Sequence, residues 1–294
     1  MSLKSILLKP IKIYNFYKAA KKNCFVEPGH YYSPDVNVDD VKKYEHTIWD
    51  NNKEIQGIDL NLSNQITLLK EFEKYYVELP FKDSAQKGLR YYFKNSYYSY
   101  SDAIMLYSFI RHYNPKNIIE VGSGFSSALM LDTKDSFKLD CNITFIEPFP
   151  VRLKSLLTDK NKNSYEIIEK RLQDVPLDEF KKLTKGDILF IDSTHVSKTG
   201  SDVNYLLFEV FPVLNVGVLI HIHDVFSSFE YPKNWVYEGR SWNEDYILRA
   251  FLMYNKEFSI RLFTHYLHTH HQEVFKNMPL CYQNNGANIW LEKL

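Results

Sequence analysis

The most informative segment of this 294-residue chain is Ile118-Ile119-Glu120-Val121-Gly122-Ser123-Gly124-Phe125-Ser126-Ser127. The apolar residues ahead of Gly122 predict a strand, and the residues after Gly124 predict the start of a helix. The two glycines let the backbone approach a ligand closely, and the first turn of the helix offers free N–H groups. This pattern is typical of nucleotide sites, although an ordinary strand-to-helix turn has the same form.

Short apolar runs alternate with helix-length segments from about residue 100 onward. The runs cover residues 117–121, 143–147, 165–169, 187–192 and 216–223. This alternation predicts a parallel sheet with helices on both faces. Two further runs, at 258–263 and 288–292, can form an antiparallel pair at one edge, and we interpret the long polar segment between them as a loop.

The first hundred residues have a different character, because they are polar and rich in Lys and Tyr. A helix is predicted over residues 103–113, with Ser101 or Asp102 as its N-cap. We predict two parts: a helical N-terminal extension or cap over residues 1–95, and one α/β domain over residues 96–294.

Composition and charge exclude several classes of function. Lys plus Arg is 36 and Asp plus Glu is 36, so no net field attracts nucleic acid or an anionic membrane. The three cysteines have no metal-type spacing, which indicates a reducing cytoplasm and no disulfide framework. The start of the chain lacks the long apolar core of a signal peptide, and no run approaches the ~18 apolar residues of a membrane span. We expect a cytoplasmic protein with a surface helix at its N-terminus, although this basic helix could also touch a membrane or a partner.

Acidic residues stand at the ends of three predicted strands. Glu147 ends the second strand, where an acid can accept both hydroxyls of a ribose. Asp192 ends the fourth strand, and Asp224 follows the fifth. Ligands bind at the carboxyl ends of strands in an open α/β sheet, so we expect these two aspartates at one edge. They suit a hard divalent cation such as Mg²⁺, and a metal-free hydrogen-bonded pair is the alternative.

Histidines accompany the two aspartates. His195 follows Asp192, and His223 immediately precedes Asp224. Either imidazole could act as a general base that removes a hydroxyl proton. His221 is expected on the same face of its strand as His223, and we interpret it as a hydrogen-bonded core residue.

A segment dense in Tyr, Trp, Arg and Glu follows the fifth strand. We predict a loop or lid here that contacts the acceptor through Tyr231, Arg240 and Trp242. Arg240 could bind a carboxylate or a phosphate with two parallel hydrogen bonds.

Two other patterns have ordinary explanations. Ser241 and Glu244 have the spacing of a helix capping box. The histidine-rich segment THYLHTHH fits no defined metal site, and we interpret it as a solvated loop.

Four segments together resemble class I S-adenosylmethionine-dependent methyltransferases: EVGSGFSS, FIEPFP, FIDSTHVSKTGSDVNYL and IHIHDVF. The resemblance covers about residues 90–294 and is closer to a bacterial group that modifies small molecules and cell-surface glycans. It implies a Rossmann-like seven-stranded sheet, mostly parallel with an antiparallel last strand. It also implies S-adenosylmethionine as the cofactor.

The resemblance further implies roles for individual residues. The cofactor-binding residues would be Glu120, Gly122, Gly124, Ser126, Glu147, Asp174 and Asp192. In this class an acid at the position of Glu120 fixes the turn beside the methionine end of the cofactor. Asp174 would reach the adenine amino group, and a helix N-cap is its alternative role.

The acceptor side follows from the same resemblance. Related sugar O-methyltransferases carry acidic metal ligands at the ends of the fourth and fifth strands, so Asp192 and Asp224 would hold a metal ion. Together with the histidine chemistry above, this predicts Asp192, His195 and His223 as the catalytic residues. Catechol-type relatives have Asn after the second acid, whereas this chain has Val225, which argues against a catechol-like metal geometry.

We therefore predict O-methylation of a small polar acceptor such as a sugar, another glycan or a secondary metabolite. Nucleic acid is not expected as a partner, and a homo-oligomer is left open. An NAD-dependent oxidoreductase would use a similar turn, but Ser127 stands where its fingerprint has a third glycine. A non-catalytic Rossmann-like binding module and a metal-dependent hydroxylase on a similar scaffold are the remaining alternatives.

Overall fold

The structure is a computed structural model that describes residues 3–50, 52–157 and 165–294. Its backbone forms two compact units. The smaller unit comprises residues 1–50 and 231–241, and the larger comprises residues 51–230 and 242–294. The predicted boundary between residues 95 and 96 does not coincide with this division, because Leu62–Tyr76 forms a helix that packs within the larger unit.

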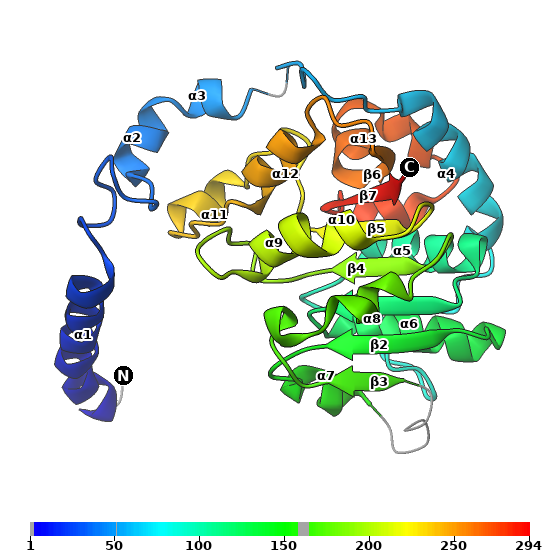
Figure 1. The fold of residues 1–294 in the computed structure, drawn as a ribbon, viewed down its shortest axis with the longest axis horizontal. Coiled ribbons are helices and arrows are strands. Elements are labelled where there is room, and N and C mark those ends of the chain that lie inside the picture. Colours follow the sequence, from blue (N-terminus) through cyan, green and yellow to red (C-terminus); the bar gives the residue numbers. More distant parts are fainter. Residues whose placement is uncertain (1–2, 51, 158–164) are drawn as a thin grey trace. The chain divides into compact units, whose positions relative to one another are not determined.

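The larger unit is built on one seven-stranded sheet with the order β3-β2-β1-β4-β5-β7-β6 (Figure 1). The strands are β1 (Asn117–Val121), β2 (Asn142–Ile146), β3 (Glu166–Ile168), β4 (Ile188–Ile191), β5 (Leu219–His223), β6 (Phe258–Phe263) and β7 (Asn288–Lys293). β7 runs antiparallel to both of its neighbours, and the other pairs are parallel. This confirms the predicted fold class.

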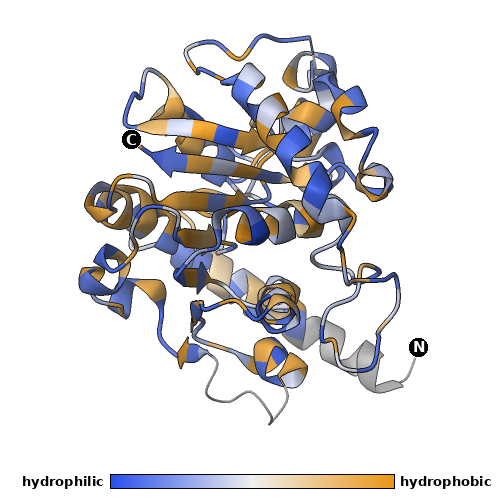
Figure 2. Cartoon of the chain, turned by 90° about the vertical axis from the view of Figure 1, so that its right-hand side faces the viewer, coloured by the Kyte–Doolittle hydropathy of each residue, from blue (hydrophilic) through white to orange (hydrophobic). Residues whose placement is uncertain are grey.

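Helices cover both faces of the sheet, and the strands between them are largely hydrophobic (Figure 2). One face carries α4 (Leu62–Tyr76), α5 (Tyr100–Tyr113), α6 (Phe125–Phe137), α7 (Val151–Leu156), α13 (Thr264–His270), η4 (Gln272–Phe275) and η5 (Pro279–Gln283). The other carries η2 (Leu172–Asp174), α8 (Leu177–Lys181), α9 (Asp202–Tyr205), the π-helical turn η3 (Leu206–Val210), α10 (Phe211–Val213) and α12 (Glu244–Leu252). Ile118 and Ile119 point into opposite cores, because successive side chains of a strand alternate between faces.

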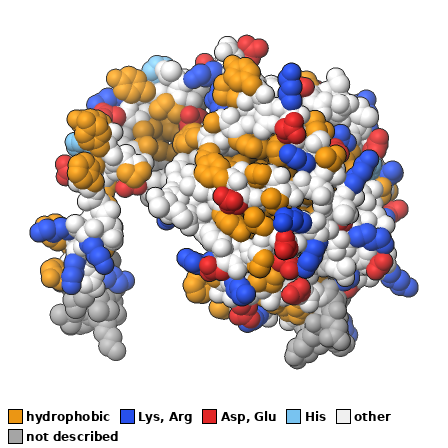
Figure 3. Space-filling view, in the orientation of Figure 1, with side chains coloured by type: hydrophobic (Ala, Val, Ile, Leu, Met, Phe, Trp, Pro, Cys, Tyr) orange, Lys and Arg blue, Asp and Glu red, His pale blue; other side chains and the backbone are white. Residues whose placement is uncertain are grey.

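The smaller unit contains α1 (Leu3–Asn23), α2 (Val38–Lys43), α3 (Glu45–Ile48) and α11 (Lys233–Tyr237). The indole N–H of Trp49 donates to the carbonyl oxygen of Tyr231, and the hydroxyl of Tyr237 donates to Glu45. These bonds tie the inserted segment 231–241 to the N-terminal part of the unit. Figure 3 shows apolar side chains at the surface here, and Phe16 and Phe25 are among the exposed ones. Among the described residues, no helix combines the length and apolar character needed to cross a membrane.

The start of α5 differs from the prediction. The helix begins at Tyr100, so Ser101 and Asp102 lie inside its first turn and do not cap it. Their side chains bind the C-terminal part of the chain instead. The Ser101 hydroxyl donates to the carbonyl oxygen of Cys281, and the Asp102 carboxylate accepts from the backbone N–H of Ala287.

The segment between β6 and β7 is also not the predicted loop, because it folds into α13, η4 and η5. His268 of the histidine-rich segment is buried, stacks on Phe275 with ring centroids 3.9 Å apart, and bonds with Ser101. His265 accepts a hydrogen bond from the backbone N–H of Ser227, and burial lowers its pKa to about 4. Aromatic packing on the helix explains this histidine spacing, and the prediction of a solvated loop was wrong.

Strand register brings the predicted site residues together. Val121 of β1 lies opposite Ile146 of β2 and Ile191 of β4, and Ile191 lies opposite Ile222 of β5. The residues that follow these four positions therefore emerge at the same edge of the sheet.

Candidate functional site

The turn after β1 is held between its two neighbouring strands. The N–H of Gly122 donates to the carbonyl oxygen of Ile146, and the N–H of Asp192 donates to that of Val121. Gly122 has a φ of 81°, and a Cβ on it would lie 1.9 Å from the carbonyl oxygen of Asp192. Only glycine fits there, both for conformation and for space.

Glu120 fixes the same turn from inside the protein. It is fully buried, and its carboxylate accepts hydrogen bonds from the hydroxyls of Ser126 and Ser127. Burial raises the pKa of Glu120 to about 8, although the two hydroxyls oppose the rise. The Ser127 hydroxyl also accepts from the N–H of Gly124 at the start of α6. Ser126 was predicted to contact the cofactor, and its hydroxyl is instead directed at Glu120.

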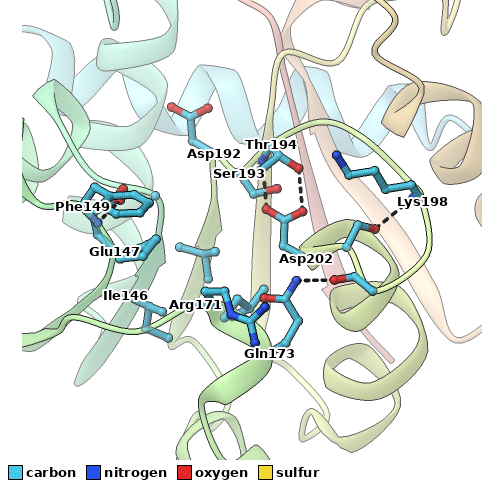
Figure 4. Close-up of a pocket in the computed structure, with 16 residues that line it drawn as sticks. Ile146, Glu147, Phe149, Arg171, Gln173, Asp192, Ser193, Thr194, Lys198 and Asp202 are labelled. Atoms are coloured by element: carbon cyan, nitrogen blue, oxygen red, sulfur yellow. Dashed lines mark hydrogen bonds between the residues drawn. The ribbon is translucent and has the colours of Figure 1, made fainter. Parts of the chain in front are cut away.

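A pocket opens beside this turn at the carboxyl ends of β1, β2 and β4 (Figure 4). Its lining includes Gly122, Glu147, Phe149, Arg171, Gln173, Asp192, Ser193, Thr194, Lys198 and Asp202. Glu147 and Phe149 stand on one side of the pocket, and one carboxylate oxygen of Glu147 accepts from the N–H of Phe149 at 2.8 Å. On the other side, the Asp202 carboxylate accepts from the hydroxyl and N–H of Thr194.

Asp174, the predicted adenine contact, is not among the residues that line this pocket. Its carboxylate pairs with the guanidinium of Arg171 at 2.9 Å. It does not cap α8 either, because the N-cap of α8 is Pro176. The neighbouring Gln173 does line the pocket, and its amide donates to the carbonyl oxygen of Gly200.

Two aspartates and two histidines meet at the same edge, and we call Asp192, His195, His223 and Asp224 the acid–histidine cluster. Nε2 of His195 lies 3.3 Å from Asp192 and 3.7 Å from Asp224. Nδ1 of His223 lies 3.6 Å from Asp192 and 3.5 Å from Asp224. His195 and Asp224 both have positive φ values, 59° and 57°, so the loops after β4 and β5 turn sharply to present these side chains.

Charges within the cluster shift its pKa values. Burial disfavours the imidazolium of His223, but Asp224 and Asp192 outweigh burial and raise its pKa to about 10. Burial also opposes charge on His195, whereas Asp192 and Glu244 raise its pKa well above the ordinary value. The two histidines in turn hold the pKa of Asp192 below its usual range against the effect of burial. The negative charge of the two aspartates therefore favours the protonated form of both histidines.

Glu244 completes the surroundings of His195. Its carboxylate lies 2.9 Å from Nδ1 of His195, and both side chains are almost fully buried. The backbone N–H groups of Asn243 and Glu244 donate to the carbonyl oxygen of His195. Sequence reasoning missed this role because Glu244 lies far along the chain from His195.

The predicted capping box is therefore wrong. The N-cap of α12 is Asn243, without a side-chain capping bond, and Ser241 donates to Asp35 in the smaller unit. The three predicted acceptor residues are divided between the units. Trp242 lies in the larger unit, with its ring centroid 4.5 Å from that of His195. Tyr231 and Arg240 belong to the smaller unit, where Tyr231 is buried and Arg240 lies over the Trp235 ring.

The cluster also fits a divalent cation. Ligand atoms of Asp192, His223 and Asp224 all lie within 4.8 Å of one another. His223 was predicted as a base, and the geometry adds it to the two aspartates as a possible ligand. Neither of its ring nitrogens has a hydrogen-bond partner among the described residues.

His221 differs from its prediction. It is fully buried, as expected, but both ring nitrogens lack a hydrogen-bond partner among the described residues. Its ring stacks on Phe190 of β4 at 4.1 Å and meets Trp290 of β7 edge-on at 4.7 Å. Burial lowers its pKa well below the usual value, so it acts here as a neutral aromatic packing residue.

The part of the chain that forms the pocket matches a known protein family. Residues 119–225, from β1 to the end of the cluster, match the profile of the family described as "Methyltransferase domain". An uncharacterized protein of the archaeon Archaeoglobus fulgidus is 34% identical over 168 residues, which cover 55% of this chain and 75% of that protein. The chain therefore contains a methyltransferase domain over residues 119–225, as the resemblance to class I S-adenosylmethionine-dependent methyltransferases implied.

Several solved methyltransferases are similar to this chain at low sequence identity. SAH-bound PaMTH1 from Podospora anserina is 14% identical, with a TM-score of 0.44 over 88% of this chain and 97% of its own. A putative caffeoyl-CoA O-methyltransferase from Staphylococcus aureus is 18% identical, with a TM-score of 0.40 over 85% and 98% of the two chains. SAH-bound CmcI is 13% identical, with a TM-score of 0.41 over 75% and 91%.

The pocket accords with S-adenosylmethionine, the cofactor that the resemblance to class I methyltransferases implies. Its lining includes Gly122 of the close-packed turn and Glu147, the acid at the tip of β2, whereas Glu120, Gly124 and Ser126 are not among the lining residues. The match of residues 119–225 to a methyltransferase domain argues against the dinucleotide interpretation of the turn.

Proposed function

We propose that the protein transfers the methyl group of S-adenosylmethionine to a hydroxyl oxygen of a small polar molecule, such as a sugar or a secondary metabolite. The observation that carries the proposal is the position of Asp192. This residue lines the pocket and also belongs to the acid–histidine cluster. Groups that can activate a hydroxyl therefore adjoin the cofactor pocket directly.

On the cofactor side, we assign Glu147 to the ribose hydroxyls, because its carboxylate lines the pocket at the tip of β2. Glu120, through Ser126 and Ser127, would keep the glycine turn in the shape that faces the methionine end. Adenine would lie toward Gln173, with Asp174 as the weaker candidate, since only Gln173 lines the pocket.

On the reaction side, the sulfonium supplies an activated methyl group, so the protein mainly has to align the acceptor and remove its proton. The acceptor oxygen attacks the methyl carbon as the C–S bond breaks, and the hydroxyl proton passes to Nε2 of His195 in its neutral form. The raised pKa of His195 makes this form a strong base but a minor species near neutral pH, so the reaction should speed up as the pH rises. Glu244 holds Nδ1 of that ring and stabilises the resulting imidazolium. A divalent cation at Asp192 and Asp224 would offset their negative charge and favour the deprotonated acceptor.

We propose that Trp242 contacts the acceptor, because its ring lies against His195. Tyr231 and Arg240 remain predictions for the same role, and residues 1–95 remain a predicted cap. The zero net charge of the chain favours a small neutral or weakly charged acceptor over nucleic acid.

The first experiment is isothermal titration with S-adenosylhomocysteine of the wild type and of Glu147→Ala, with and without divalent metal. Micromolar binding that weakens at least tenfold in the variant is expected, since hydrogen bonds to a charged group contribute ~1.5–3 kcal/mol. A panel of hydroxylated sugars and phenols is then tested with methyl-labelled cofactor. Tight binding without transfer to any oxygen acceptor would favour the non-catalytic alternative, and label on nitrogen or sulfur would overturn the O-methyl assignment.

A further inference from the structure

We propose that Nδ1 of His223 is a metal ligand together with Asp192 and Asp224, and that the site consequently prefers a first-row transition-metal dication to Mg²⁺. The inference deepens the proposed function and rests on it for the role of the ion. The metal preference itself is a property of the donor atoms and can be measured without turnover.

The first observation is that the ring of His223 is buried and lacks hydrogen-bond partners in the described part of the chain. The residue is only 7% exposed, and neither ring nitrogen has a hydrogen-bond partner among the described residues. A buried polar group without a hydrogen-bond partner destabilises the folded state, so the ring nitrogens call for a partner. Nδ1 faces both carboxylates at 3.5–3.6 Å, which is too long for a good hydrogen bond and leaves room for an ion between them.

The second step is the support behind the ring. Metal-binding histidines usually direct their second nitrogen at a carboxylate or a carbonyl oxygen. Nε2 of His223 faces the carboxylate of Asp102 at 3.9 Å. Asp102 is itself fixed by the N–H of Ala287 and the amide of Asn288, and the Tyr98 ring packs 5.2 Å from the imidazole. The ring is thus oriented with Nδ1 toward the two aspartates.

The third step is the chemistry of the donor set. Mg²⁺ prefers oxygen ligands and retains several waters. Imidazole suits Zn²⁺, Ni²⁺ and Fe²⁺, and affinity for a site with nitrogen donors rises from Mn²⁺ through Co²⁺ to Ni²⁺. Two carboxylates alone would favour Mg²⁺, as the sequence suggested, and the added nitrogen of His223 shifts the preference toward transition metals.

The test uses the full chain, stripped of metal with a chelator and without cofactor, titrated with MgCl₂, MnCl₂ and CoCl₂. We expect Co²⁺ to bind more tightly than Mn²⁺, and Mg²⁺ to bind at least tenfold more weakly than Co²⁺. His223→Asn should reduce Co²⁺ affinity by more than roughly tenfold, the lower end of what loss of an outer-shell partner causes. His223→Glu replaces nitrogen with oxygen and should restore Mg²⁺ binding relative to Co²⁺.

Two further measurements make the outcome unambiguous. The visible absorption of bound Co²⁺ should change in His223→Glu, because a nitrogen ligand is replaced by oxygen. His270→Asn, an exposed histidine outside the cluster, should leave all metal affinities unchanged. Equal affinity for Mg²⁺ and Co²⁺ in the wild type, or unchanged preference in His223→Asn, would overturn the inference. Binding of S-adenosylhomocysteine to the metal-free protein tests the proposed function separately, so the two failures can be told apart.

Discussion

The backbone carbonyl oxygen of Asp192 occupies the space into which any side chain on Gly122 would project, since a Cβ there would lie 1.9 Å away. The obstacle is backbone, and it is held by the strand hydrogen bond from the N–H of Asp192 to Val121. The ends of β1 and β4 can therefore adjoin only because residue 122 is glycine.

Replacing Gly122 with Ala should abolish detectable binding of S-adenosylhomocysteine and lower the melting temperature. The substitution adds a backbone clash and strain at a positive φ. Gly124→Ala is the matched control. Its Cβ would meet only the Arg152 side chain at 3.3 Å, and its backbone is extended, so the loss should be much smaller. Equal effects of both variants on titration and melting would contradict the close-approach argument.

Glu120 should make stability depend on pH. Its folded pKa of about 8 exceeds the ordinary 4.5, so the folded chain keeps a proton that the unfolded chain releases. This contribution to stability is complete below about pH 4.5 and is lost as the pH rises toward 8, with a slope of at most ~1.4 kcal/mol per pH unit. Urea unfolding between pH 5.5 and 8.5 should show that slope reduced in Glu120→Gln. An equal pH dependence of the free energy of unfolding in the wild type and in Glu120→Gln would contradict the raised pKa of Glu120.

The adenine end of the pocket can be tested with two adjacent residues. Gln173→Ala should weaken S-adenosylhomocysteine binding several-fold, because its side chain lines the pocket. Asp174→Ala should change affinity less than twofold, since its carboxylate pairs with Arg171 and does not line the pocket. Titration calorimetry measures both. A larger loss of affinity in Asp174→Ala than in Gln173→Ala would support the predicted contact of Asp174 with adenine.

Removing the charge of Glu244 should lower the pKa of His195, because that carboxylate helps to raise it. NMR titration of the His195 ring in Glu244→Gln measures the shift directly. Methyl transfer should fall by about 10²-fold or more, the usual size of a general-base contribution, while affinity for S-adenosylhomocysteine stays within twofold. An unchanged His195 pKa, or a loss confined to cofactor binding, would show that Glu244 is merely structural.

The three thiols should react at different rates with a thiol reagent. Cys24 is exposed and should be modified at once. Cys141 and Cys281 are buried, and burial raises the pKa of each to about 12, so they should react only after unfolding. Ellman's titration before and after denaturation counts them. If more than one thiol of the native protein reacts rapidly, Cys141 and Cys281 are not both buried.

The central sheet and its carboxyl-terminal edge were predictable from sequence, because local patterns carry that information. The turn Gly122–Gly124 identifies a strand followed by a helix, and polar residues at the ends of apolar runs identify the edge at which Glu147, Asp192 and Asp224 meet. Parallel register then brings them together without further information.

The sequence predictions that proved wrong concern residues whose partners lie far away along the chain. Asp102 has the spacing of an N-cap, but its partners Ala287 and Asn288 lie at the other end of the sequence. Glu244 has the spacing of a capping box, yet it binds His195. Local capping rules assign such residues to the nearest helix, and only the folded chain reveals a competing partner.

Asp192 belongs both to the cofactor pocket and to the acid–histidine cluster, and this shared position has a thermodynamic consequence. A ligand that reorients or neutralises its carboxylate at one site alters the free energy of occupancy at the other. Linkage requires the two effects to be reciprocal: if a cation strengthens cofactor affinity by some factor, the cofactor strengthens cation affinity by the same factor. The two sites would then fill cooperatively, and neither affinity can be quoted without the concentration of the other ligand.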